Sequence, residues 1–290
     1  MLPETDTYLE HKRARELAGA HGVEGGAKPT VTSTFIREGK VAVKRHWILL
    51  TYLVLLMAGF NFMSHGSQDL YPVMLTNEFG FNANQVTITQ VVANLGAMSG
   101  GTLVGFGSQI FGRRFSIICC CIVGGALLYP YGFVSSESIM AAAFFEQFCV
   151  QGAWGVIPIH LMELSPGAFR TFVVGTSYQL GNLVSSASST IEARLGERFP
   201  LPPNPKDGSA RYDYGKVICI FMGCVYAYVM LLAFIGPEHL KRKFDVGYDA
   251  DVGEALGQEV LREERRLERG RHSEEEGRGS EKATTSIGER

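Results

Sequence analysis

The sequence predicts an all-α membrane protein with six transmembrane helices, and two features of its composition carry that prediction. The first is the distribution of charge. Residues 1–46 carry 14 Asp, Glu, Lys and Arg side chains and residues 236–290 carry 25, whereas the 189 residues between them carry only 17. The second is that this middle region divides into apolar runs of roughly 20 residues, the length of a helix that crosses about 30 Å of hydrocarbon. A soluble single-domain enzyme is close to excluded by this pattern.

The predicted membrane domain covers residues 47–236 and is flanked by polar segments on both sides. Its six spans are predicted over residues 47–75, 86–111, 115–134, 139–162, 169–191 and 217–236. Residues 1–46 are predicted to form a cytoplasmic linker. Residues 237–290 are predicted to form a cytoplasmic tail that is partly disordered, because it is rich in charge and poor in apolar side chains.

The predicted orientation rests on basic residues beside the spans. They are Lys40, Lys44, Arg45, Arg113, Arg114, Arg170, Lys241, Arg242 and Lys243. By the positive-inside rule these positions are cytoplasmic, and an even number of spans then puts both termini on that side. The loop over residues 194–216 carries five Lys and Arg residues, which weakens the rule there, but its LPPNP stretch suits an extended external segment. We expect an integral protein of the plasma membrane with both termini cytoplasmic.

Motifs for enzymatic or metal chemistry are not visible in the sequence. The six cysteines all lie inside apolar runs, with no CxxC pair and no histidine at zinc spacing. No nucleotide-binding loop and no basic patch for nucleic acid can be recognised. We therefore expect no enzymatic activity, no cofactor, no metal and no nucleic-acid partner, and we expect membrane lipid around the chain.

The most informative stretch is NFMSHGSQDLYP, residues 61–72, near the end of the first predicted span. At 100° per residue, five of its polar side chains fall on one helix face. They are Asn61, Ser64, His65, Gln68 and Asp69. Burying such groups in lipid would cost several kcal/mol each, so this polar stripe must face protein or a water-filled path. Ionisable groups inside a span indicate a transport or proton-relay function.

A second interpretation of the stripe stays open. A minimal span of ~20 residues counted from Trp47 reaches only about Gly66, so the helix could end near Phe62 and continue as an external loop. The apolar VML that follows Pro72 argues instead that the helix continues. We therefore favour the pore-lining interpretation.

The same stretch resembles the signature of the fungal lactate and pyruvate proton symporters of the major facilitator superfamily, whose seventh helix carries Asn-x-x-Ser-His-x-Ser-Gln-Asp. The matching residues are Asn61, Ser64, His65, Ser67, Gln68 and Asp69. The family has Thr four residues after the Asp, whereas this chain has Val73, so a hydroxyl role at this position is not expected. The resemblance implies substrate recognition and proton coupling for Asn61, His65 and Asp69. It also implies that the six spans form one half of a major facilitator fold.

A second segment, GFGSQIFGRR over residues 105–114, resembles the superfamily's loop motif Gly-x-x-x-Asp-Arg-x-Gly-Arg-Arg. The residues kept are Gly105, Gly112, Arg113 and Arg114. Gln109 and Ile110 replace the acid and the base of the motif. Losing the acid removes a charge contact between helices, so we expect this segment to provide turn geometry rather than gating.

A third segment, PIHLMELSPGAFR, places Glu163, Pro166 and Arg170 as in the superfamily's Glu-x-x-Pro-x-x-x-Arg element. An acid and a base near a cytoplasmic helix junction can lock one conformation and release another, as alternating access requires. A static cap at a helix end is the alternative.

The fifth predicted span supplies two more candidate substrate contacts. The resembling family binds substrate through a Gln and an Asn three residues apart in the corresponding helix, which implies this role for Gln179 and Asn182. Uncharged amides donate to a carboxylate without the desolvation penalty of a second ion. Hydrogen bonding between helices is the alternative. Glu146 lies in the fourth span, where we expect it to be protonated or paired with Gln147 or Gln151, in a packing or a proton role.

Together these features predict proton-coupled transport of small monocarboxylates such as lactate and pyruvate. A cotransported proton cancels the charge of the anion, which otherwise costs about 2.3 kcal/mol per 100 mV to bring into a negative cytoplasm. Major facilitator proteins have two six-span halves with the site between them. Since the resemblance covers only the second half and no Lys or Arg lies mid-span, we expect a truncated or half-size chain that needs a missing N-terminal six-span half. A non-transporting membrane scaffold or nutrient sensor is the alternative.

Overall fold

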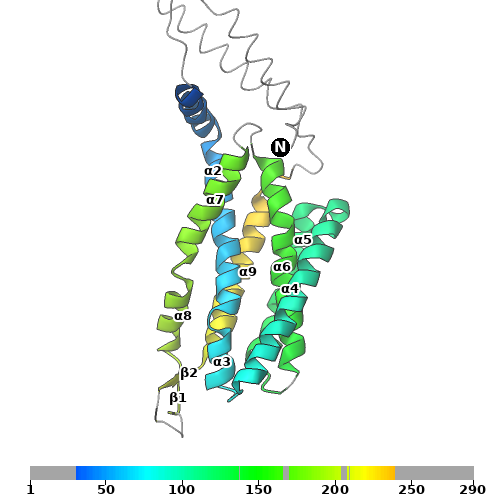
Figure 1. The fold of residues 1–290 in the computed structure, drawn as a ribbon, viewed down its shortest axis with the longest axis vertical. Helices are drawn as coiled ribbons and strands as arrows, with labels where there is room; N and C mark the ends of the chain where they lie inside the picture. Colours follow the sequence, from blue (N-terminus) through cyan, green and yellow to red (C-terminus); the bar gives the residue numbers. More distant parts are fainter. Residues whose placement is uncertain (1–30, 137, 166–169, 204–207, 209, 239–290) are drawn as a thin grey trace, which may run out of the picture. The chain divides into compact units, whose positions relative to one another are not determined.

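The computed structural model describes residues 31–136, 138–165, 170–203, 208 and 210–238, which are mostly helical (Figure 1). The helices are α2 (Val31–Gln68), α3 (Tyr71–Asn77), α4 (Ala83–Phe111), α5 (Arg113–Phe133), α6 (Ile139–Leu164), α7 (Arg170–Ser185), α8 (Ser188–Gly196) and α9 (Tyr214–Ile235). Two short strands, β1 (Pro200–Leu201) and β2 (Arg211–Tyr212), pair antiparallel in the loop before α9. The predicted all-α class is confirmed for this part of the chain.

The chain divides into two compact units, Met1–Arg45 and His46–Arg290. Helix α2 runs across the boundary between them, and its backbone departs from helical geometry at His46 (φ −114°, ψ 20°). Within the first unit only the helical residues from Val31 onward are described. Most of the predicted linker and nearly all of the predicted tail lie outside the described residues. The contacts of the candidate site lie within the second unit.

Three of the described helical segments are long and apolar enough to cross a membrane. They are His46–Asn77, Arg113–Phe133 and Tyr214–Ile235. These match the first, third and sixth predicted spans. Helices α4 and α6 occupy the second and fourth predicted spans and have 29 and 26 residues, but they are not among these three segments. The number of six spans therefore stays a prediction.

All residues of the polar stripe except Asp69 lie on helix α2. Helix α2 continues to Gln68, and α3 begins only three residues later at Tyr71. Pro72 occupies the first turn of α3, where its missing N–H costs nothing. This continuation favours the pore-lining interpretation over a loop that starts near Phe62.

The fifth predicted span is not one helix, contrary to the expectation for residues 169–191. It is divided into α7 and α8 by a turn at Ser186 and Ala187. The hydroxyls of Ser185 and Ser186 donate to the carbonyls of Asn182 and Leu183, three residues earlier. Serine side chains that bond to nearby carbonyls in this way compete with the helix ladder. The serine-rich SSASS sequence therefore explains the break.

Glycines bring α4 and α6 into backbone contact. A Cβ at Gly96 would lie 2.1 Å from the carbonyl oxygen of Phe144, and one at Gly100 would lie 2.1 Å from that of Phe148. Any larger residue would push the two helices apart, because the obstructing atoms belong to backbone. Small residues four apart allow membrane helices to pack this closely.

Helix α2 is the central element for the candidate site, because it packs against α6, α7 and α9 (Figure 1). A Cβ at Gly181 of α7 would lie 2.7 Å from the backbone of Met57. On another side the Tyr52 hydroxyl donates to the Leu232 carbonyl of α9 at 3.2 Å. The close approach at Gly181 also places the next residue of α7, Asn182, within reach of the polar stripe.

Candidate functional site

The last turns of α2 place His65 between two polar partners. Its Nδ1 lies 3.2 Å from Oδ2 of Asp69, the residue that directly follows α2. Its Nε2 lies 3.3 Å from Oδ1 of Asn182 on α7. Both ring nitrogens therefore face oxygen atoms, and both contacts are hydrogen bonds only if the ring carries two protons. If the Asn182 amide turns over, it donates instead to a neutral ring, so this contact can respond to the gain or loss of one proton.

A second cluster joins the stripe to α5 and α6. Nε2 of Gln68 donates to Oε1 of Gln147 at 2.9 Å, and Nε2 of Gln147 donates to the Ser67 hydroxyl at 3.1 Å. The Tyr131 hydroxyl of α5 donates to the Ser67 carbonyl at 2.5 Å. Sequence reasoning did not assign Gln147 or Tyr131 to the site. For Gln147 a signal was available, because an amide inside a predicted span is costly to bury unless it is hydrogen-bonded.

The remaining predicted residues of the stripe bond within their own helix. Asn61 is buried, and its Nδ2 donates to the Met57 carbonyl at 2.8 Å. The carbonyl of Ser64 accepts the Ser67 hydroxyl at 3.1 Å. Gln179 is not part of the stripe; the family resemblance implies that it binds substrate together with Asn182. Its side chain is exposed on α7. The structure thus joins Asn182, but not Gln179, to His65 among the described residues.

Glu146 is fully buried on α6, and its partner differs from the expected Gln147 or Gln151. Its Oε1 accepts the Tyr226 hydroxyl of α9 at 2.5 Å. Its Oε2 meets no hydrogen-bond donor among the described residues. Gln147, one residue along the helix, points to the stripe instead. The choice between a packing and a proton role for Glu146 stays open.

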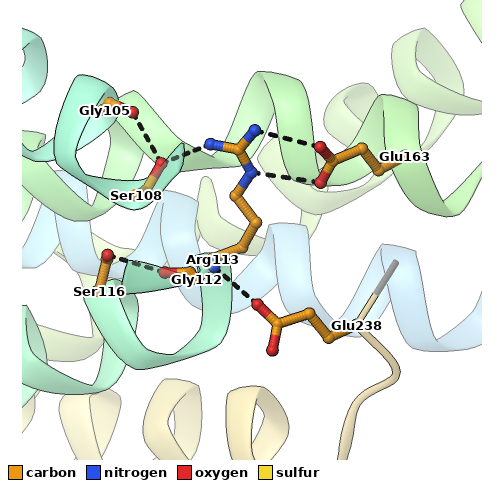
Figure 2. A network of polar contacts seen from close by, with 7 residues as sticks. All are labelled: Gly105, Ser108, Gly112, Arg113, Ser116, Glu163 and Glu238. Atoms are coloured by element: carbon orange, nitrogen blue, oxygen red, sulfur yellow. Dashed lines mark hydrogen bonds and ion pairs between the residues drawn. The ribbon is translucent and has the colours of Figure 1, made fainter. Parts of the chain in front are cut away.

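A separate network lies around Arg113, at the start of α5 (Figure 2). Its guanidinium bonds to both carboxylate oxygens of Glu163, with Nε to Oε2 at 3.2 Å and Nη2 to Oε1 at 3.1 Å. The side chains are only 5% and 3% exposed, so this is a buried ion pair between α5 and α6. Nη1 also donates to the Ser108 hydroxyl at 2.6 Å, and that hydroxyl donates to the Gly105 carbonyl at 2.7 Å.

This ion pair corrects the interpretation of residues 105–114 as turn geometry alone. The acid absent from the loop motif is supplied by Glu163, 50 residues further along the chain. Turn geometry is also present, since Gly112 connects α4 and α5 with φ 102°, a conformation that strongly favours glycine. The segment therefore combines a tight turn with a charge contact between helices.

Two neighbouring contacts tie the end of α9 to the same turn. Arg114 donates through Nε to the Ala233 carbonyl at 2.6 Å and through Nη2 to the Phe234 carbonyl. These carbonyls have no partner inside the helix, and a cation there also complements the helix dipole. Beyond the helix, Glu238 accepts the backbone N–H of Arg113 at 2.7 Å (Figure 2). The turn thus holds three helix ends together.

The predicted element of Glu163, Pro166 and Arg170 is only partly described by the structure. Arg170 is half-buried in the first turn of α7. Pro166, the middle residue of that element, lies outside the described residues. The structure gives Glu163 a defined role in the Arg113 network, while a role for Arg170 in a conformational lock stays a prediction.

Comparison with known proteins identifies the class to which this arrangement belongs. Residues 1–246 match the family described as "Sugar (and other) transporter". The chain belongs to this family of transporters within the major facilitator superfamily. It is also 39% identical over 247 residues to a protein of Saccharomyces cerevisiae (strain ATCC 204508 / S288c) named "Carboxylic acid transporter protein homolog".

The alignment covers 83% of this chain but only 40% of the yeast protein. The chain therefore spans less than half the length of this relative. The predicted resemblance to the major facilitator superfamily is confirmed.

Proposed function

We propose that this chain contributes half of a pathway for the proton-coupled transport of small monocarboxylates such as lactate and pyruvate. The observation that carries the proposal is the contact of His65 with Asp69 on one side and Asn182 on the other. It links an imidazole, which can take up and release a proton, to a carboxylate and to an amide on a different helix. The name of the yeast relative supports a carboxylic acid as the substrate.

The chemistry of the proposed site suits an anion that travels with a proton. A protonated His65 and the amides of Gln68 and Asn182 are donors for a carboxylate, whereas Asp69 repels it unless a proton neutralises one of the two acids. Binding of proton and anion together therefore cancels charge in the site. The same cancellation removes the cost of about 2.3 kcal/mol per 100 mV for moving an anion against the membrane potential.

The Arg113–Glu163 pair supports a conformational role at the opposite end of α6. Alternating access requires contacts that stabilise one conformation and separate in the other. A buried ion pair that also bonds to Ser108 meets this requirement, because it exists only while α5 and α6 keep this arrangement. We therefore propose that Arg113 and Glu163 act as a lock, with Arg114 holding the end of α9 beside them.

A complete site requires a second six-span half in this proposal. Major facilitator sites lie between two halves, and the predicted spans contain no mid-span Lys or Arg to bind the substrate carboxylate. The second half would supply that cation. The proposal includes location in the plasma membrane with both termini cytoplasmic, as the basic residues beside the spans indicate.

The test is uptake of labelled lactate into liposomes that contain this chain joined to a six-span first half from a carboxylic acid transporter. An inward proton gradient should drive saturable accumulation, and an uncoupler should abolish it. Binding without accumulation under any gradient would instead indicate a sensor or scaffold and would refute the proposal.

A further inference from the structure

Glu192 on α8 is a buried carboxyl that none of the preceding contacts uses. Its residue is 0% exposed, and neither carboxylate oxygen meets a hydrogen-bond donor in the part of the chain that the structure describes. A carboxylate that loses water without gaining donors is strongly disfavoured, whereas a neutral carboxylic acid loses much less on burial. The surroundings of Glu192 therefore suit the protonated form.

The neighbours of Glu192 point the same way and place it beside the candidate site. The negative charge of Asp69 acts on the Glu192 carboxyl and opposes a second negative charge there. Glu192 is therefore coupled by charge to the His65–Asp69 pair.

The basic residue nearest in sequence on α8 does not compensate the charge of Glu192. Arg194 has a 75% exposed side chain and pairs with Glu197, itself 53% exposed, at 3.2 Å. One turn later on α8, the position of Gly196 faces the ring of Tyr214 and the Cβ of Tyr212. In the described residues, the charge that acts on Glu192 is therefore the negative one of Asp69.

We propose that Glu192 is a proton-binding site next to the His65–Asp69 pair. In the conformation described here the proton resides on the Glu192 carboxyl. Transfer moves one proton from the oxygen of Glu192 to a carboxylate oxygen of Asp69, leaving Glu192 ionised and Asp69 neutral, with no other reactant. Such a transfer requires a rearrangement that brings water or donors to Glu192. The role in transport rests on the proposed function above, whereas the protonation of Glu192 does not.

Glu192 differs from the other buried acid, Glu146, in both respects that matter for proton exchange. Glu146 accepts a hydrogen bond from the Tyr226 hydroxyl, which fixes one of its carboxyl oxygens between α6 and α9. Glu192 has no such bond within the described residues, and it sits on a nine-residue helix separated from α7 by a turn. A small movement of this short helix would change its contact with water.

The first test is infrared spectroscopy of the 290-residue chain in lipid at neutral pH. Glu192→Gln should remove the carbonyl band of a protonated, buried carboxylic acid, and Glu192→Asp should shift it. The matched control Glu197→Gln, an exposed acid on the same segment, should leave the band unchanged. A band that is identical in the wild type, Glu192→Gln and Glu192→Asp would overturn the proposal. If Glu192→Gln fails to insert, the band shift in Glu192→Asp decides.

The second test separates exchange from proton-driven transport in the paired transporter. Glu192→Gln should retain lactate counterflow, which needs no net proton movement, and should lose accumulation driven by a proton gradient. Accumulation equal to that of the wild type would overturn the role in coupling. If the wild type shows no lactate counterflow, the proposed function fails, and the infrared band still decides whether Glu192 holds a proton.

Discussion

His65 and Asn182 are 117 residues apart in the chain, yet Nε2 of the first lies 3.3 Å from Oδ1 of the second. This contact exists because Gly181 allows the backbones of α7 and α2 to approach closely. A Cβ added at Gly181 would lie only 2.7 Å from the Met57 carbonyl carbon. One glycine thus connects the packing of two helices to the chemistry of the candidate site.

The first prediction concerns the stripe itself. In the paired transporter, His65→Ala or Asp69→Asn should abolish proton-coupled lactate uptake, because each removes one side of the contact between Nδ1 and Oδ2. Val73→Thr is the control and should retain uptake. Val73 is 37% exposed, so a threonine hydroxyl at this position avoids the free-energy cost of burying an unpaired polar group. Surface biotinylation would show that each variant reaches the membrane. Normal uptake by both His65→Ala and Asp69→Asn would contradict the pore-lining interpretation.

The second prediction concerns the buried ion pair. Removing one partner should destabilise the fold by about 3–5 kcal/mol, because the other charge is left buried. The variants are Arg113→Met and Glu163→Leu, measured by unfolding in detergent. The double variant should cost much less than the sum of the two, because no unpaired charge remains. Additive effects would contradict a direct pair.

The control for this cycle is the exposed pair of Arg194 and Glu197. Its N and O atoms lie 3.2 Å apart, against 3.1 Å in the buried pair, but its side chains are 75% and 53% exposed. Arg194→Met should change stability by only about 0–1 kcal/mol, because solvent screens an exposed pair. An equal effect at both sites would show that burial is not the cause.

The third prediction concerns pH. Glu78 follows α3 and accepts the backbone N–H groups of Tyr214 and Gly215 at the start of α9. Burial raises its pKa from 4.5 to about 7, although these N–H bonds oppose the shift. A raised pKa in the folded state means that the folded protein binds the proton more tightly than the unfolded chain does. The stabilisation from Glu78 is therefore complete below about pH 4.5 and is lost as pH rises through about 7.

Thermal unfolding in detergent from about pH 4 to about pH 8 covers both pKa values. The effect is measured as the difference in unfolding temperature between the wild type and Glu78→Gln. The neutral amide cannot ionise, so the wild type should lose stability relative to the variant as pH rises. Glu197→Gln controls for an exposed acid, at the end of α8. A constant difference between wild type and Glu78→Gln across this range would refute the prediction.

The apolar runs and the stripe could be predicted because they are local patterns, with a period of 3.6 residues and a motif of nine consecutive positions. The helix break between α7 and α8 was missed, although the SSASS sequence carries its cause. The Arg113–Glu163 pair, Gln147 beside Gln68 and the environment of Glu192 could not be predicted, because each depends on which helices become neighbours. A single sequence shows that a side chain is polar, but not which partner satisfies it.

The fourth prediction concerns topology. In a background where the six native cysteines are replaced, a single cysteine at Ser209 should be labelled in intact cells by an impermeant reagent, and one at Ser280 should not. The reason is that basic residues beside the spans predict cytoplasmic termini and an external loop over residues 194–216. Labelling of Ser280→Cys before the cells are permeabilised would reject this orientation.

The last prediction concerns the 290-residue chain expressed alone. Each predicted span can satisfy its backbone hydrogen bonds within its own helix, so the chain should insert into a membrane. Transport should fail, because the His65 and Asp69 side chains are 37% and 35% exposed without any cation opposite them in the predicted spans. Co-expression with a matching six-span half should restore part of the lactate uptake, and the Asp69→Asn chain should not. Saturable, proton-dependent uptake by the purified chain as a monomer in liposomes would show that no second half is needed.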